Sequence, residues 1–183
     1  MIKYMNPRHY SYTSCFAVAF MLILVLVSAA GCIRDPDKEY GGRGEYISVG
    51  AHIPEMLDAV VYTVQDETYM ISPQEEGMSI AAVRTRAVNR NSTHVTISVD
   101  EDTAMLRSEN GDEFKPFEPS KRAVKTSETA PKDNPYISHL WGQYTVIQNY
   151  EIAGWFFFEV PHDSAFTEFS WDDVEFVRVI YRY

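Results

Sequence analysis

Short runs in which apolar and polar residues alternate fill most of the chain after residue 57, and they constrain the fold more than any other feature. In "HVTISV" (94–99) every second residue is Val or Ile. Strand side chains alternate between two faces, so this period of two predicts half-buried β-strands. The segments predicted as strands are 58–64, 78–89, 94–99, 104–117, 143–152, 154–160 and 174–183, with a hairpin turn at Asn110-Gly111.

Strands without a convincing helical segment predict an all-β domain. About seven short antiparallel strands favour an immunoglobulin-like antiparallel β-sandwich, with a jelly roll as the alternative. Two long connections interrupt the strands, at 118–136 and 161–173. The first is polar and contains prolines, so we predict that it is exposed and mobile.

The first 32 residues have the features of an export signal. An apolar run from Cys15 to Ala30 follows Lys3 and Arg8, and it is shorter than the roughly 20 residues that a spanning helix needs. Small residues stand directly before Cys32, which resembles the lipobox of lipoprotein signal peptides. We therefore predict a lipoprotein signal peptide over 1–32 with lipid on Cys32; the alternative is a single-pass anchor extended to Ile33.

Residues 33–46, "IRDPDKEYGGRGEY", separate this signal from the predicted domain. They have no apolar periodicity and contain Pro36 and three glycines, so we predict a flexible tether and a domain over 47–183. After cleavage Cys32 is the one remaining cysteine of the two in the chain. The domain therefore has no internal disulfide, and its stability depends on its core.

The charge of the chain excludes two classes of partner. Beyond residue 32, 14 Lys and Arg residues stand against all 26 Asp and Glu residues, a formal charge of −12. Nucleic-acid binding needs clustered Lys and Arg, and so does electrostatic docking on an anionic membrane. We therefore predict no nucleic-acid partner, and the composition suits an extracellular surface.

Several segments together resemble a known family. These are "VGAHIPEMLDAVVYTV", "AAVRTRAVNRNS", "MLRSENGDEFKPF" and "GWFFFEVP", in this order. They are similar to the telokin-like, immunoglobulin-type domains of unknown function found in prokaryotic surface lipoproteins, over about residues 47–183. The resemblance implies a β-sandwich at the cell surface. It implies no catalytic residues, because no activity is assigned to the family.

The sequence predicts no catalytic residue, no metal site and no cofactor. His9 lies in the signal, and the other histidines, His52, His94, His139 and His162, are not at metal-ligand spacing. The acidic segments "DEDT" (100–103) and "WDD" (171–173) lack the pattern of a calcium loop. "GGRG" (41–44) lacks the GK[ST] of a phosphate loop, and no GxSxG is present.

Two kinds of candidate site remain in the domain. Asn91 begins the sequon "NST" on a predicted turn and is a candidate glycosylation site. In "GWFFFEV", Trp155 and Phe157 share a strand face with Glu159, which predicts an outer face. These two residues, with Trp141 and Tyr150, form a candidate binding face. The alternative, which we prefer, is that residues 118–136 cover Trp155 and Phe157.

These observations predict an exported lipoprotein, attached to the cell membrane or cell surface by its N-terminal lipid. The domain is predicted to be a non-enzymatic module that binds an envelope protein or glycan. The alternative is a cell-envelope hydrolase whose site is formed by the loops 118–136 and 161–173.

Overall fold

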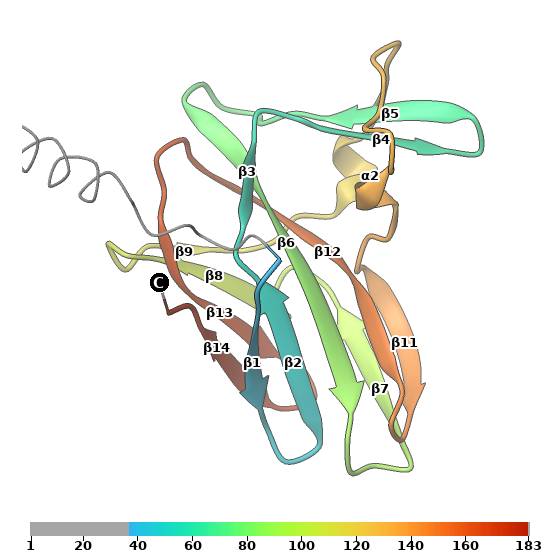
Figure 1. Ribbon diagram of the computed structural model, residues 1–183, viewed down its shortest axis with the longest axis vertical. Coiled ribbons are helices and arrows are strands. Elements are labelled where there is room, and N and C mark those ends of the chain that lie inside the picture. The colour runs from blue at the N-terminus through green and yellow to red at the C-terminus, as the bar shows by residue number, and fades with distance from the viewer. Residues whose placement is uncertain (1–36, 183) are drawn as a thin grey trace, which may run out of the picture. The chain divides into compact units, whose positions relative to one another are not determined.

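The computed structural model describes residues 37–182, and the signal, Cys32 and the first part of the predicted tether lie outside this range. The described part is nearly all antiparallel β-structure (Figure 1), which confirms the predicted all-β sandwich. The strands are β1 (Glu39–Arg43), β2 (Ile47–His52), β3 (Glu55–Leu57), β4 (Val60–Val64), β5 (Glu67–Ile71), β6 (Met78–Asn89), β7 (His94–Val99), β8 (Ala104–Ser108), β9 (Glu113–Phe114), β10 (Val124–Lys125), β11 (Gly142–Ile147), β12 (Glu151–Pro161), β13 (Phe166–Asp172) and β14 (Phe176–Ile180). The two short helices are α2 (Pro119–Arg122) and the 3-10 helix η1 (Pro135–Ile137).

Two long strands, β6 and β12, form the centre of the fold (Figure 1). They pair along their whole length, from Met78 opposite Pro161 to Val88 opposite Glu151. The other edge of β6 pairs with β2 and with β3, and β1 pairs with β2, which gives a five-stranded sheet. Alanines at several positions of β6 leave room for the large aromatic side chains of β12, so layers can pack closely on both faces.

The main core lies between this sheet and a second one. The second sheet has the strand order β14-β13-β8-β9, and β7 and β11 form a separate pair. Phe156 and Phe158 of β12 meet Phe169 and Trp171 of β13 in this core. The alternation predicted for β7 is confirmed, because Val95, Ile97 and Val99 are its buried residues.

A third layer covers the opposite face of β6 and β12. The strands β10, β5 and β4 form a small sheet at the top of Figure 1. Val60, Tyr62 and Ile71 from this sheet pack on Trp155 and Phe157 in a second buried cluster. Burial on both faces explains why "GWFFFEV" has no polar face over most of its length.

The prediction of a flexible tether over 33–46 is wrong for residues 39–43, because they form the edge strand β1, which pairs with β2. The glycines that predicted a flexible tether have a packing role. A Cβ on Gly42 would lie 2.2 Å from the carbonyl oxygen of Arg178, because β1 passes directly over β14. The domain therefore begins about eight residues before the predicted boundary at residue 47.

Strand boundaries differ from the prediction where the period of two is interrupted. Residues 143–152 are not one strand, because a turn at 148–150, with Asn149 at a φ of 66°, separates β11 from β12. The predicted connection 161–173 contains β13, in which a bulge between Phe166 and Glu168 shifts the alternation. The hairpin at Asn110-Gly111 is confirmed, with Gly111 at a φ of 89°.

The segment 118–136 is mostly exposed, as we predicted, and it is also attached to the sandwich at several points. Its β10 residues pair with Tyr69 and Met70 of β5. Asn134 closes the free edge of β4: the backbone N–H of Thr63 donates to its Oδ1 (2.9 Å), and its Nδ2 donates to the Thr63 carbonyl (2.7 Å). A side-chain amide here replaces a neighbouring strand.

Candidate functional site

The predicted aromatic binding face is buried within the domain. Trp155 is 6% exposed and Phe157 is 0% exposed. The Trp155 indole N–H donates to the carbonyl of Pro135 (2.7 Å), and the Tyr136 ring lies 4.9 Å from the Trp155 ring. Phe117 stacks on Phe157 at 6.3 Å. Trp155 and Phe157 are therefore core residues, covered from within by 118–136 as we preferred, and also by the β4–β5 hairpin.

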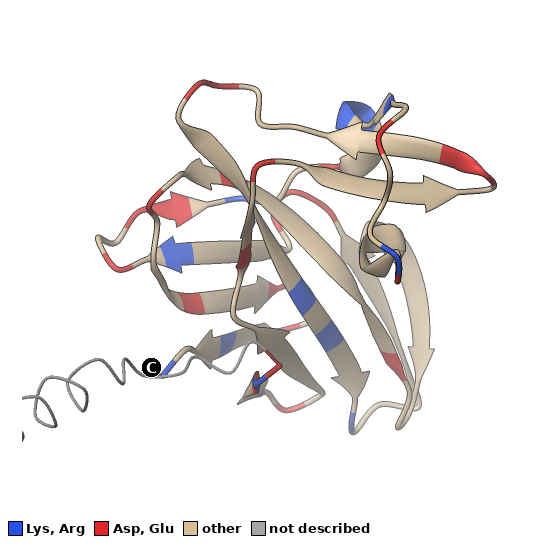
Figure 2. Cartoon of the chain, turned by 45° about the horizontal axis from the view of Figure 1, so that its top comes forward, with Lys and Arg blue, Asp and Glu red and all other residues tan. Residues whose placement is uncertain are grey.

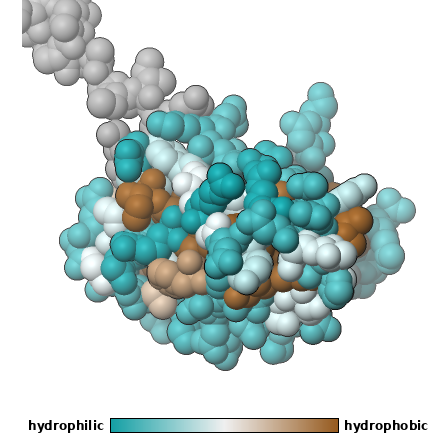
Figure 3. Space-filling view, turned by 90° about the horizontal axis from the view of Figure 1, so that it is seen from below, coloured by the Kyte–Doolittle hydropathy of each residue, from teal (hydrophilic) through white to brown (hydrophobic). Residues whose placement is uncertain are grey.

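The other two residues of that face are not buried with Trp155 and Phe157. Tyr150 is 64% exposed in the β11–β12 turn, and Trp141, directly before β11, is partly exposed. Figure 3 views the end of the sandwich that carries the β1–β2, β6–β7 and β11–β12 turns, and hydrophobic patches there are separated by hydrophilic side chains.

Trp141 lines a pocket of about 410 Å³, within the range of about 300–1,000 Å³ that is usual for small-ligand sites. We call it the Trp141 pocket. Three parts of the chain form it: the β7–β8 turn, the segment from β9 through α2, and the residue before β11. Its lining residues are Glu101, Lys115, Pro116, Phe117, Glu118, Lys121, Arg122 and Trp141.

The backbone of Trp141 is held on both sides by Tyr144. The Trp141 N–H donates to the Tyr144 hydroxyl (3.1 Å), and this hydroxyl donates to the Trp141 carbonyl (2.9 Å). Gly142 follows with a φ of 96°, which a residue with a side chain rarely adopts. The tight turn into β11 thus fixes where Trp141 stands.

Arg122, which also lines the pocket, is held by two contacts. Its guanidinium lies over the Phe117 ring, 3.8 Å from the centroid, and pairs with Glu159. Glu159 also accepts the backbone N–H groups of Gln74 (2.6 Å) and Glu75 (3.1 Å). Burial by itself would raise the pKa of Glu159, but these N–H groups and Arg122 outweigh it, so the pKa is lowered. Arg122 is therefore oriented by an ionised carboxylate.

Phe117 is positioned by an added strand pairing. Its N–H donates to the Phe157 carbonyl (3.0 Å), and Pro116 forms a bridge with Phe158. The helix α2 then begins with Pro119 at its first turn, which suits proline because that N–H has no helical partner. This single turn presents Lys121 and Arg122 together.

The charges around the pocket are balanced. Lys115 pairs with Asp102 (2.5 Å), and Lys121 pairs with Glu118 (2.7 Å). The hydrogen bonds that the two lysines donate to these carboxylates raise the pKa of both lysines. The hydrogen bond from Lys121 is the main cause of the lowered pKa of Glu118. Figure 2 shows acidic residues spread over many turns and strands, with basic residues on α2 and β6.

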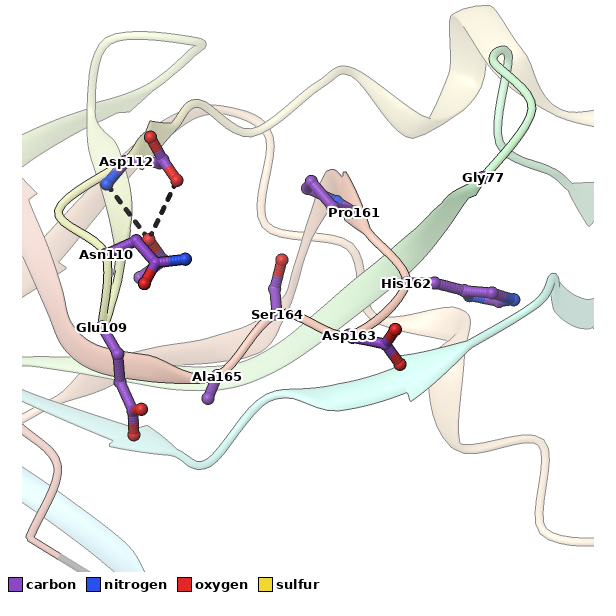
Figure 4. A pocket seen from close by; sticks show the side chains of 10 residues that line it. Gly77, Glu109, Asn110, Asp112, Pro161, His162, Asp163, Ser164 and Ala165 are labelled. Atoms are coloured by element: carbon purple, nitrogen blue, oxygen red, sulfur yellow. Dashed lines mark hydrogen bonds between the residues drawn. The ribbon is translucent and has the colours of Figure 1, made fainter.

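A second pocket, of about 490 Å³, lies between the β8–β9 turn and the β12–β13 turn (Figure 4). Glu109, Asp112 and Asp163 supply carboxylates to it, and Asp112 is bonded to Ser108, whose hydroxyl accepts the Asp112 N–H (3.0 Å). The His162 side chain points away from Asp112. The loops 118–136 and 161–173 do not line either pocket together, contrary to the arrangement expected for a hydrolase.

Ser79, His162 and Asp58 have the residue types of a nucleophilic triad. The Ser79 hydroxyl is hydrogen-bonded to Nδ1 of His162, and Nε2 of this histidine lies 3.9 Å from Asp58. A nucleophile must reach its substrate, yet Ser79 is 2% exposed. We interpret the contact as structural, since it joins β6 to the β12–β13 turn.

Within residues 37–182, no group of three His, Cys, Asp or Glu side chains comes together in a way that could hold a metal ion. His139 is instead packed between Tyr62 (4.7 Å) and Phe157 (5.4 Å), and burial lowers its pKa. In the same part of the chain, no helix has the length and apolar character needed to cross a membrane.

The remaining predicted site residues are Asn91 and Cys32. Asn91 is exposed in the β6–β7 turn, and its side-chain amide donates to the Glu45 carbonyl. Cys32 lies outside the described residues. Lys115, Lys121 and Arg122, which line the Trp141 pocket, were not singled out from the sequence. Their clustering within "KPFEPSKR" (115–122), on an otherwise acidic chain, was the signal that could have found them.

No family model matches the chain. No curated protein matches it either. Among solved structures, the crystal structure of MPT63, a secreted protein from Mycobacterium tuberculosis, is similar, with a TM-score of 0.39 and 11% identity over 78% of this chain and 92% of that one. The class that the strands themselves define is an all-β antiparallel sandwich.

Proposed function

We propose that this protein is an exported, lipid-anchored binding protein whose β-sandwich recognises a component of the cell envelope without catalysing a reaction. The observation that carries the binding role is the Trp141 pocket. It combines the partly exposed indole of Trp141 with side chains that donate and accept hydrogen bonds. Tyr144 holds the Trp141 backbone, and Phe117 holds Arg122.

A hydrolytic role has less support from this site. A glycosidase acid needs a raised pKa, so that it is protonated when the substrate binds. The pKa of Glu118 is lowered, chiefly by the hydrogen bond from Lys121, which keeps this carboxyl ionised. Ser79 lies outside this pocket, and because it is buried its hydroxyl cannot reach a substrate as a nucleophile.

Attachment through Cys32 is supported by the apolar run and the small residues before it. One acyl chain gives marginal membrane binding and two hold stably, at about 0.8 kcal/mol per buried CH₂.

The experiment that tests the anchor is metabolic labelling of the full chain with a radioactive fatty acid. We expect label and membrane fractionation for the natural chain and neither for Cys32→Ser. Labelling of Cys32→Ser equal to that of the natural chain would disprove the anchor. Co-sedimentation with isolated cell envelope then tests the binding role.

A further inference from the structure

We infer that the Trp141 pocket binds a neutral saccharide, with one sugar ring stacked on Trp141 and its hydroxyls bonded to the charged side chains around it. This inference rests on the proposed binding function, because it names the class of ligand for the same site.

The apolar side of the ligand would contact Trp141. Phe117 is also partly exposed, but Arg122 lies over its ring at 3.8 Å and Phe157 stacks on it at 6.3 Å, so Trp141 is the aromatic face that the pocket offers. An aromatic face carries partial negative charge and attracts weakly positive C–H groups. A pyranose ring presents such C–H groups on its faces and its hydroxyls around the rim. It therefore matches a single indole surrounded by polar groups.

The rim of the pocket is polar. Lys115, Lys121 and Arg122 can only donate hydrogen bonds, whereas Glu101 and Glu118 can only accept them when ionised. A hydroxyl both donates and accepts, so a ligand with several hydroxyls satisfies both kinds of residue. Hydrogen bonds to charged partners are about twice as strong as neutral ones.

The charges around the pocket disfavour an anionic ligand. Each of the three cations is already paired with a carboxylate: Lys115 with Asp102, Lys121 with Glu118, and Arg122 with Glu159. A phosphate or uronate would compete with these carboxylates for the same cations and would be repelled by them and by Glu101. The negative charge of the chain adds to this repulsion. A neutral hydroxyl can bond to the remaining N–H groups of the cations without this repulsion.

Trp141 and Arg122 are preorganised. Tyr144 holds the Trp141 backbone, and Glu159 with Phe117 holds Arg122, so these groups lose little freedom when a ligand binds. Lys121 pairs with Glu118, but its side chain is 77% exposed, so its other N–H groups are accessible to a ligand.

The test measures binding of short sugars to the full chain in a detergent without a sugar head group. The neutral probes are tri-N-acetylchitotriose, cellotriose, maltotriose and mannotriose; the anionic probes are trigalacturonate and inorganic phosphate. Saturation-transfer NMR reports binding, and indole fluorescence reports the site. Trp141 is the indole to respond, because Trp155 and Trp171 are buried.

We expect at least one neutral trisaccharide to bind saturably and with a shift of the indole emission. Trp141→Ala should weaken it about tenfold, which corresponds to 1.4 kcal/mol. Trp141→Phe, which keeps an aromatic face, should weaken it less, and Lys121→Ala should weaken it severalfold. Tyr150→Ala is the matched control, because it removes an exposed aromatic outside the pocket and should change nothing.

The inference is wrong if no neutral probe binds, if trigalacturonate or phosphate binds more tightly, or if Trp141→Ala binds equally well. Co-sedimentation of the natural chain with cell envelope separates this failure from failure of the proposed function. Envelope binding that protease treatment abolishes, together with no saccharide binding, retains the binding role but assigns it to a protein partner. No envelope binding at all removes the proposed function itself.

Discussion

Replacing Trp155 with alanine tests whether the third layer is part of the folded core. Trp155 is 6% exposed and lies in a cluster with Tyr62, Tyr136 and Phe157. Truncation of a buried Trp to Ala costs about 3–5 kcal/mol, because apolar contacts are lost and a cavity remains. The hydrogen bond to Pro135 adds little, since Pro135 is exposed and its carbonyl can bond to water instead.

The assay is urea denaturation of the natural domain and the variant, followed by circular dichroism. With an m-value of about 1–3 kcal/mol/M, a loss of 3 kcal/mol lowers the midpoint by at least about 1 M. Trp155→Phe fills part of the cavity and should lose about 1–2 kcal/mol. Trp141→Ala, on the rim of a pocket, should lose less than about 1 kcal/mol. A loss for Trp155→Ala of less than about 1 kcal/mol would refute the reasoning and make this face available to a partner.

Two further changes test contacts that join distant parts of the chain. The Glu175 carboxylate accepts the backbone N–H groups of Glu45 (2.7 Å), Tyr46 (2.7 Å) and Ile47 (2.6 Å). Glu175→Ala should therefore lower the free energy of unfolding by about 1–3 kcal/mol. A loss under about 0.5 kcal/mol, as for an exposed ion pair, would contradict this role. The hydrogen bond from Arg86 lowers the pKa of Glu39 below its ordinary 4.5, so the folded state favours the ionised form. The stabilisation is therefore fully present above pH 4.5 and is lost as the pH falls through the folded-state pKa of Glu39. Glu39→Gln should make the free energy of unfolding depend less on pH in this acidic range. An unchanged pH dependence in the variant would disprove the link between the Glu39 pKa and stability.

Much of the fold could be predicted because strand periodicity is local. The alternation in β7, the Asn-Gly turn between β8 and β9, and the long strand β6 all come from residues next to one another in the chain. Predictions failed where a distant contact changes the local rule. β1 was missed because its glycines are typical of a tether, and only the close approach of β14 explains Gly42. β13 was missed because the bulge between Phe166 and Glu168 interrupts the period of two in its sequence.

The candidate site shows the same limit more strongly. The sequence placed Trp141 in a candidate binding face together with Trp155 and Phe157, which the fold buries under another layer. Glu101, Arg122 and Trp141 come from three separated segments, and no local pattern indicates that they share one pocket.

By itself, the sequence determined the all-β class, the acidic surface and the absence of an internal disulfide, because these follow from composition and from a period of two. Only the tertiary structure decided which aromatic residues are core and which can meet a ligand. Trp155 and Trp141 are chemically identical, and the difference between them is the layer formed by residues 58–71 and 118–136. That layer forms through long-range pairing, whose free energy depends on contacts between segments and not on the residues of either segment alone.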